Sequence, residues 1–82
     1  TERSPAVPQA EEAMIRGMVE GLAARLEDSP DDLGGWLRLV RSYKVLNEQE
    51  KARKAIASAR AAFAGDEAAL ARIEEAEKTL AD

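Results

Sequence analysis

The chain has 82 residues and a net charge of −4, with 34% charged and 4% aromatic residues, and it contains neither cysteine nor histidine. This length allows one small domain whose core is only marginally self-sufficient. The chain has no thiolate for disulfides and no imidazole, which is the usual base and the commonest metal ligand. We therefore expect that the chain is not an enzyme, because its serines and threonines have no histidine to activate them. We also expect no cofactor and no metal site. The acidic balance also argues against binding of nucleic acid.

The composition predicts an all-helical chain. Alanine, leucine, glutamate, lysine and arginine dominate, and no alternating run of apolar residues indicates a strand. Residues 1–10 contain Pro5 and Pro8 without apolar periodicity, so we expect a flexible leader there. Residues 11–82 are then expected to form the one folded domain.

The first helix is expected from about Glu11 to Glu27. Its apolar positions fall on one face, namely Ile15, Met18, Val19, Leu22 and Leu26. Gly17 and Gly21 lie one turn apart on this helix, where each glycine costs about 1 kcal/mol relative to alanine. Close approach of a neighbouring helix or of a partner is the expected compensation. We also assign Met14 and Met18 to the core, and contact with a peptide is the alternative because thioethers suit an adaptable site.

The second helix is expected to start after an aspartate cap. Asp31 or Asp32 can accept hydrogen bonds from the free backbone N–H groups of its first turn. The helix should run to about Leu46, and Asn47 then makes a short turn into the next helix.

The third helix is expected from about Glu48 to Ala64. Gly65 fits a left-handed cap at its end, since glycine adopts positive φ without steric cost. Asp66 is then expected to cap a fourth helix that ends near Leu80.

The second and third helices carry the most specific pattern in the chain. Large residues recur at i, i+3 and i+7 on the second helix, and small or aliphatic residues recur at i, i+4 and i+7 on the third. These expected core residues are Trp36, Leu39 and Tyr43, followed by Ala52, Ile56 and Ala59. The alanines allow close approach of the two backbones, and the large side chains fill the remaining space. This spacing resembles the tetratricopeptide (TPR) repeat.

The repeat register extends in both directions and predicts the fold class. Residues 33–66 make one full repeat, Pro30 stands where a preceding repeat would close, and Leu70 follows Trp36 by one repeat length. A half repeat therefore flanks the full repeat on each side. We expect an all-α fold, with antiparallel helical hairpins forming a TPR-like right-handed solenoid fragment of about four helices.

The charge distribution indicates a binding surface for a peptide or protein. Residues 36–60 carry seven basic and two acidic residues, whereas residues 1–35 and 61–82 have net charges of −5 and −4. The concave face of such an array should combine an apolar floor with a basic edge, which suits an amphipathic helix or a terminal carboxylate. Its expected residues are Leu37 and Val45 as the floor, Arg38, Arg41 and Lys44 as the edge, and Arg72 from the fourth helix. The alternative is that these charges are only solvated or complement the acidic neighbours.

A closer resemblance rests on residues 14–63, and especially on the pair Met18-Val19 in combination with Gly35-Trp36. This stretch resembles the TPR region of the cytochrome c-type biogenesis protein CcmI (CycH) family, although Val40 replaces the usual repeat glycine and Ala64 the closing proline. The resemblance implies the periplasmic part of an inner-membrane-anchored bacterial protein. It further implies a holdase that captures apocytochrome c, chiefly by its C-terminal helix, and works with other cytochrome c maturation proteins in haem ligation.

One alternative function remains at this point. A generic TPR scaffold would assemble protein complexes, or would form a homodimer through its exposed half repeats. Such a scaffold has the same core pattern and is equally non-catalytic, so the pattern alone does not separate the two.

Overall fold

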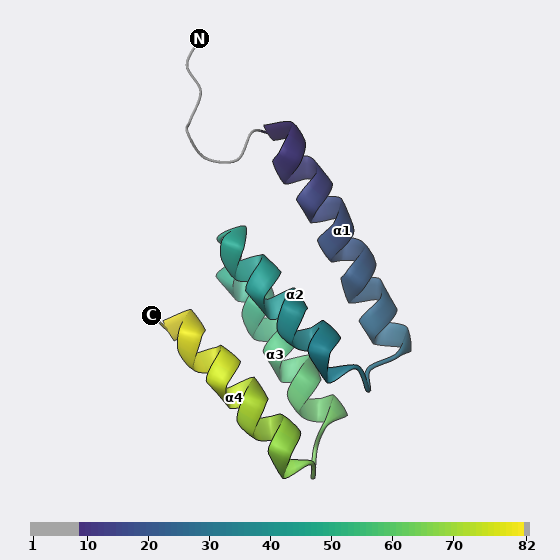
Figure 1. Cartoon of the computed structure of the whole chain (residues 1–82), viewed down its shortest axis with the longest axis vertical. Coiled ribbons are helices and arrows are strands. Elements are labelled where there is room, and N and C mark those ends of the chain that lie inside the picture. Colours follow the sequence, from purple (N-terminus) through teal and green to yellow (C-terminus); the bar gives the residue numbers. More distant parts are fainter. Residues whose placement is uncertain (1–8, 82) are drawn as a thin grey trace.

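The computed structural model describes residues 9–81, which form four α-helices and no strand (Figure 1). The helices are α1 (Gln9–Asp28), α2 (Leu33–Val45), α3 (Gln49–Ala62) and α4 (Glu67–Ala81). The expected all-α class is confirmed. Most of the expected leader lies outside the described residues, and α1 begins at Gln9, two residues earlier than the sequence indicated.

The helix α2 is the centre of the fold, because it packs against all three other helices. Its neighbours are α1, α3 and α4, and α3 also packs against α4. In Figure 1, α1 and α4 lie on opposite sides of α2, and α3 lies behind it. Consecutive helices are therefore joined as hairpins, and α2 and α4 share one face of the molecule.

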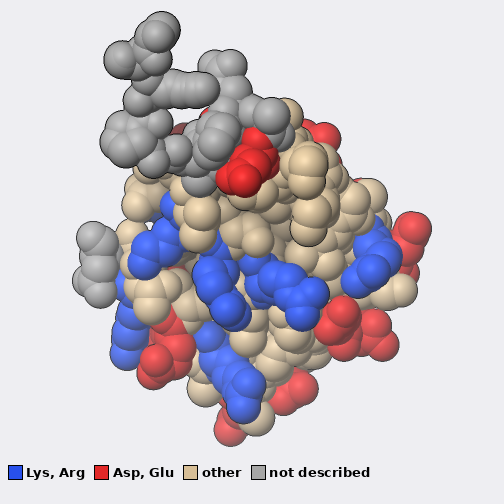
Figure 2. Space-filling view, turned by 45° about the horizontal axis from the view of Figure 1, so that its top comes forward, with Lys and Arg blue, Asp and Glu red and all other residues tan. Residues whose placement is uncertain are grey.

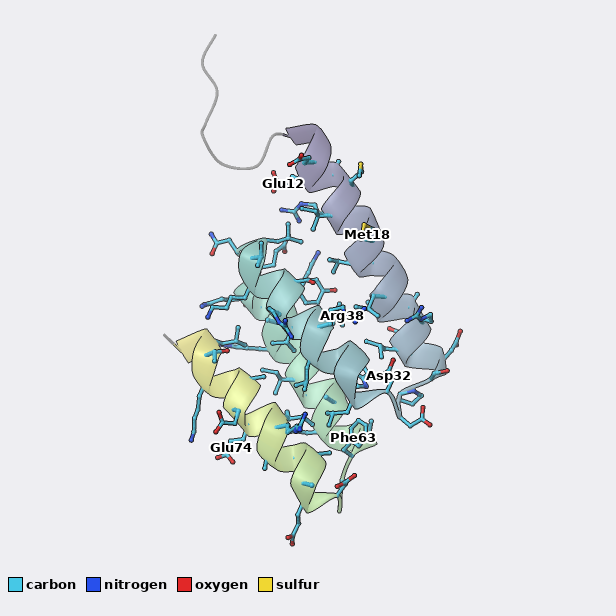
Figure 3. The ribbon with its side chains drawn as sticks, in the orientation of Figure 1. Glu12, Met18, Asp32, Arg38, Phe63 and Glu74 are labelled. Atoms are coloured by element: carbon cyan, nitrogen blue, oxygen red, sulfur yellow. The ribbon has the colours of Figure 1, made fainter. Side chains whose placement is uncertain are left out.

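Short polar signals fix the helix ends where the sequence indicated them. The carboxylate oxygen Oδ1 of Asp32 accepts from the Gly35 backbone N–H at 3.0 Å, which caps α2 (Figure 3). The Oδ1 atom of Asp66 accepts from the Ala69 N–H at 3.2 Å and caps α4 in the same way. Gly65 has φ 90°, so the left-handed turn after α3 requires glycine.

The core runs along the contact between α2 and its three neighbours. Trp36 is 5% exposed and Ala52 is fully buried, so the close approach of α2 and α3 expected from the large and small residues is present. Tyr43 is half-buried and packs against the edge of this core. The remaining buried apolar residues are Val19, Leu26, Leu39, Val40, Ala55, Ile56, Ala59, Ala69, Ile73 and Leu80.

The expected core position of two methionines is wrong. Met14 and Met18 are 65% and 70% exposed, because Val19 and Leu26 form the face that α1 buries against α2. Adjacent helix positions are about 100° apart, so Met18 points well away from Val19. No neighbouring helix of the described structure approaches Gly17 or Gly21 closely, since a Cβ atom added to either would have no neighbour within 4 Å.

Candidate functional site

A hollow of about 400 Å³ lies between α2 and α4, and we call it the α2/α4 groove. The helix α2 contributes Leu37, Val40, Arg41 and Lys44, and α4 contributes Arg72, Glu75, Ala76 and Thr79. Both sets have the spacing i, i+3, i+4, i+7, so each is one continuous stripe on its helix. The two stripes face the same hollow because α3 returns the chain behind α2 and places α4 beside it.

The groove combines an apolar floor with a positive edge. Val40 is buried beneath it, whereas Arg41 and Arg72 are exposed at its rim. Among the described side chains, neither arginine takes part in an ion pair. Figure 2 shows Lys and Arg side chains in a band across this part of the surface, with Asp and Glu toward its margins. A ligand carboxylate at this rim would gain charge-assisted hydrogen bonds from the guanidinium groups.

Lys44 makes an intramolecular hydrogen bond at the surface that the sequence did not indicate. Its Nζ atom donates to the Thr79 carbonyl at 2.8 Å, and the Thr79 hydroxyl donates to the Ala76 carbonyl at 2.7 Å. The Gln49 amide donates to the Leu80 carbonyl at 3.1 Å. Lys44 and Gln49 thus satisfy carbonyl groups in the last turn of α4, where the helix dipole favours a positive charge. Lys44 therefore joins α2 to α4 and closes one end of the groove.

Four of the six expected binding residues meet in the groove, and two do not. Leu37, Arg41, Lys44 and Arg72 line it together. Arg38 lies instead at a second hollow, between α1 and α2. Val45 is 69% exposed and lies outside the groove lining. Each of the two follows a groove residue directly in the sequence, so its side chain is turned about 100° away from the hollow. A peptide-binding role for these residues stays a prediction.

Ion pairs hold the outer helices to the central hairpin. Arg16 on α1 donates to the carboxylate of Glu48, just before α3, and also pairs with Glu12 at 3.0 Å (Figure 3). The hydrogen bond from Arg16 lowers the pKa of Glu48, and the same contact raises the pKa of Arg16. Arg60 and Glu77 form a comparable pair between α3 and α4. These partly exposed pairs link α1 and α4 to the hairpin of α2 and α3, and pairs of this kind add little to the stability that the core provides.

Comparison with known proteins gives two relatives. The cytochrome c-type biogenesis protein CycH of Bradyrhizobium diazoefficiens is 52% identical to this chain over 68 residues, or 83% of the chain. The protein of the same name from Rhizobium meliloti is 52% identical over 52 residues, or 63% of the chain. This chain is homologous to part of CycH. The resemblance to CycH drawn from residues 14–63 is thereby confirmed, and the TPR character of this stretch stays a prediction.

The match to CycH is local. The chain spans 18% and 14% of the lengths of the two CycH relatives. No family model matches the chain, and no solved structure matches it. Within residues 9–81, none of the helices has the length and apolar character needed to cross a membrane.

Proposed function

We propose that this chain is a non-catalytic binding module of cytochrome c maturation, and that its α2/α4 groove holds the C-terminal helical segment of apocytochrome c. The observation that carries the proposal is the pair of matching stripes on α2 and α4, with an apolar floor and unpaired arginines at the rim. Homology to CycH supports the pathway, because both relatives are named for cytochrome c-type biogenesis.

The shape and charge of the groove favour an amphipathic helix as the ligand. A helix can place an apolar stripe against Leu37 and Val40, as in other helix-in-groove complexes. Carboxylates beside that stripe would then lie near Arg41 and Arg72. Each groove stripe spans eight residues, or about 10 Å of helix from its first residue to its last, so the groove contacts only about two turns of a ligand. Affinity should be modest, about micromolar, because the disordered apo segment must be ordered on binding.

Binding of this segment would allow the module to distinguish apocytochrome from holocytochrome. In holocytochrome the C-terminal helix packs on its own core, so its apolar face is not available to the groove. In apocytochrome the same segment is free to bind. We place the module in the periplasm, as part of an inner-membrane-anchored bacterial protein that hands apocytochrome to the other maturation proteins for haem ligation.

Isothermal calorimetry with three ligands tests this proposal. The ligands are the C-terminal peptide of a c-type cytochrome from the same organism, a scrambled peptide of equal composition, and the holocytochrome. We expect micromolar binding of the first ligand only, and a peptide without haem-attachment cysteines should bind equally well. Equal heats from the C-terminal and scrambled peptides, or no binding of either, would favour a generic scaffold instead.

A charge-reversal pair links that binding to the groove. Arg41→Glu with Arg72→Glu should weaken the C-terminal peptide about 5- to 150-fold, which corresponds to about 1–3 kcal/mol for charges placed against ligand carboxylates. The matched control is Arg53→Glu with Lys54→Glu, which reverses two exposed charges on α3. Both doubles should keep the helical circular dichroism signal. Equal loss of affinity in the two doubles would mean that net charge alone drives binding.

A further inference from the structure

The helix α1 has an outer face that nothing in the described structure covers. Along this face Glu11, Met14, Met18, Gly21 and Arg25 recur at alternating spacings of three and four residues. This spacing forms one straight seam on a helix and is the pattern by which helices pair with each other. Met14 and Met18 are 65% and 70% exposed, and no large apolar residue in the described structure is more exposed than Met18. The seam is therefore apolar at its centre and charged at its two ends.

The glycines beside these methionines point to a close neighbour. Gly17 and Gly21 stand in the interior of α1, where glycine is disfavoured, and an added Cβ atom at either would meet nothing within 4 Å. Next to them, a hollow of about 380 Å³ separates α1 from α2, and its lining includes Met18, Gly21 and Arg38. A helix lying on this seam could approach the α1 backbone at the glycines and fill the hollow.

The internal repeat supplies a covered equivalent of this face. Met18, Gly21 and Arg25 precede Ala52, Ala55 and Ala59 by 34 residues. Those three alanines are buried in the core that α3 shares with α2. The face that α1 leaves open is thus equivalent to the face that α3 buries against α2. Arg25 stands exposed at the position equivalent to the buried Ala59, so an acidic group on the occupant of this face could pair with it.

We propose that a second copy of this chain covers the seam, with the two α1 helices antiparallel across a two-fold axis. In this register Met14 of one copy lies opposite Gly21 of the other, so its side chain fills the space left by the glycine, and the two Met18 side chains meet at the two-fold axis. Glu11 of one copy then lies opposite Arg25 of the other, and the two-fold axis repeats the pair at the far end. Parallel helices would instead oppose Glu11 to Glu11 and Arg25 to Arg25.

The size of the seam sets the strength of the association. Residues 11–25 span about 21 Å of helix, so the contact belongs to the small class of interfaces, below about 1,200 Å² in total. We therefore expect a weak dimer with a dissociation constant of tens of micromolar or more. This dimer involves a different face from the α2/α4 groove and does not rest on the proposed function.

Sedimentation velocity of the 82-residue chain, from about 10 µM to about 500 µM, tests the proposal over the range expected of a small interface. We expect the weight-average mass to rise toward that of a dimer. Met18→Glu should abolish this rise, because two carboxylates would meet near the two-fold axis. The matched control, Val45→Glu, changes an equally exposed apolar residue and should dimerise like the wild type. Circular dichroism should be unchanged in both variants.

Charge exchange tests the antiparallel register. Glu11→Arg and Arg25→Glu should each weaken the dimer several-fold, and the double variant should restore it, because opposite charges face each other again. A chain that stays monomeric throughout the range would overturn the proposal and leave the seam to some other helix. A dimer insensitive to Met18→Glu would overturn it as well. Failure of the double variant to regain affinity would exclude this register.

Discussion

Replacement of Trp36 by alanine should destabilise this domain strongly. The indole is 5% exposed, lies in the core at the junction of α2 with α1 and α3, and donates from Nε1 to the Pro30 carbonyl at 2.9 Å. Pro30 is exposed, so water can replace the indole as the hydrogen-bond donor. The main loss is therefore buried apolar volume, which the surrounding helices can refill only in part.

The size of this effect follows from the size of the domain. Trp→Ala in a core costs about 3–5 kcal/mol, whereas a chain of this length has about 4–12 kcal/mol of total stability. Each kcal/mol lowers the melting temperature of so small a domain by about 4–8 °C. We expect Trp36→Ala to melt at least about 12 °C below the wild type, or to be unfolded at room temperature. Trp36→Phe keeps a buried ring and should cost about 1–2 kcal/mol.

Thermal melting followed by circular dichroism measures the difference, and urea titration checks it at constant temperature. Both should be done at low protein concentration, so that self-association does not contribute to stability. A Trp36→Ala variant that melts within a few degrees of the wild type would contradict this prediction. It would mean that the ring is not part of the core, and the repeat register built on Trp36 would fall with it.

Three further changes test individual contacts of the fold. Gly65→Ala should destabilise the fold by about 1–2 kcal/mol in urea titrations, because φ is positive at this residue. Gly17→Ala should stabilise the fold by up to about 1 kcal/mol, because alanine favours a helix and no neighbouring atom obstructs the added Cβ. Equal effects of the two substitutions would contradict both reasons. Lys44→Met should lower the free energy of unfolding by about 0.5 kcal/mol and speed amide hydrogen exchange in the last turn of α4. Unchanged exchange there would show that the hydrogen bond to the Thr79 carbonyl does not stabilise this turn. Because Arg16 lowers the pKa of Glu48 in the folded state, the stabilisation by this pair should be complete above the unfolded-state value of about 4.3 and disappear as the pH falls through the lower folded-state value. Urea titrations of the wild type and Glu48→Gln should therefore converge at acidic pH, and a gap that persists there would exclude the ion pair as its cause.

Local signals in the sequence predicted most of the fold. Asp32, Asp66 and Gly65 act within one turn of their own position, so composition and spacing were enough to place the helix ends. The spacing around Trp36 was likewise enough to identify the face that α2 buries. On α1 this reasoning failed for Met18, because two neighbouring faces are both apolar and only the packing of α2 decides between them.

The candidate site shows the same division between local and tertiary information. The stripe containing Leu37 and Arg41 follows from helical spacing, so the sequence placed these residues together. Arg38 follows Leu37 directly and is turned about 100° from it, but only the packing of α1 beside α2 shows that it lies at a second hollow. The hydrogen bond from Lys44 to the Thr79 carbonyl joins residues 35 positions apart, and no local pattern indicates it.

We propose that the α2/α4 groove holds the C-terminal helical segment of apocytochrome c. A titration of the ¹⁵N-labelled chain with that peptide, followed by backbone amide chemical shifts, shows directly where the peptide binds. We expect saturable shifts that concentrate at Leu37 and Arg41 on α2 and at Arg72 on α4, while the amide signals of Arg53 on α3 and Met18 on α1 stay near their starting positions. Shifts concentrated on α1 or α3, or an absence of saturable shifts, would contradict the proposal.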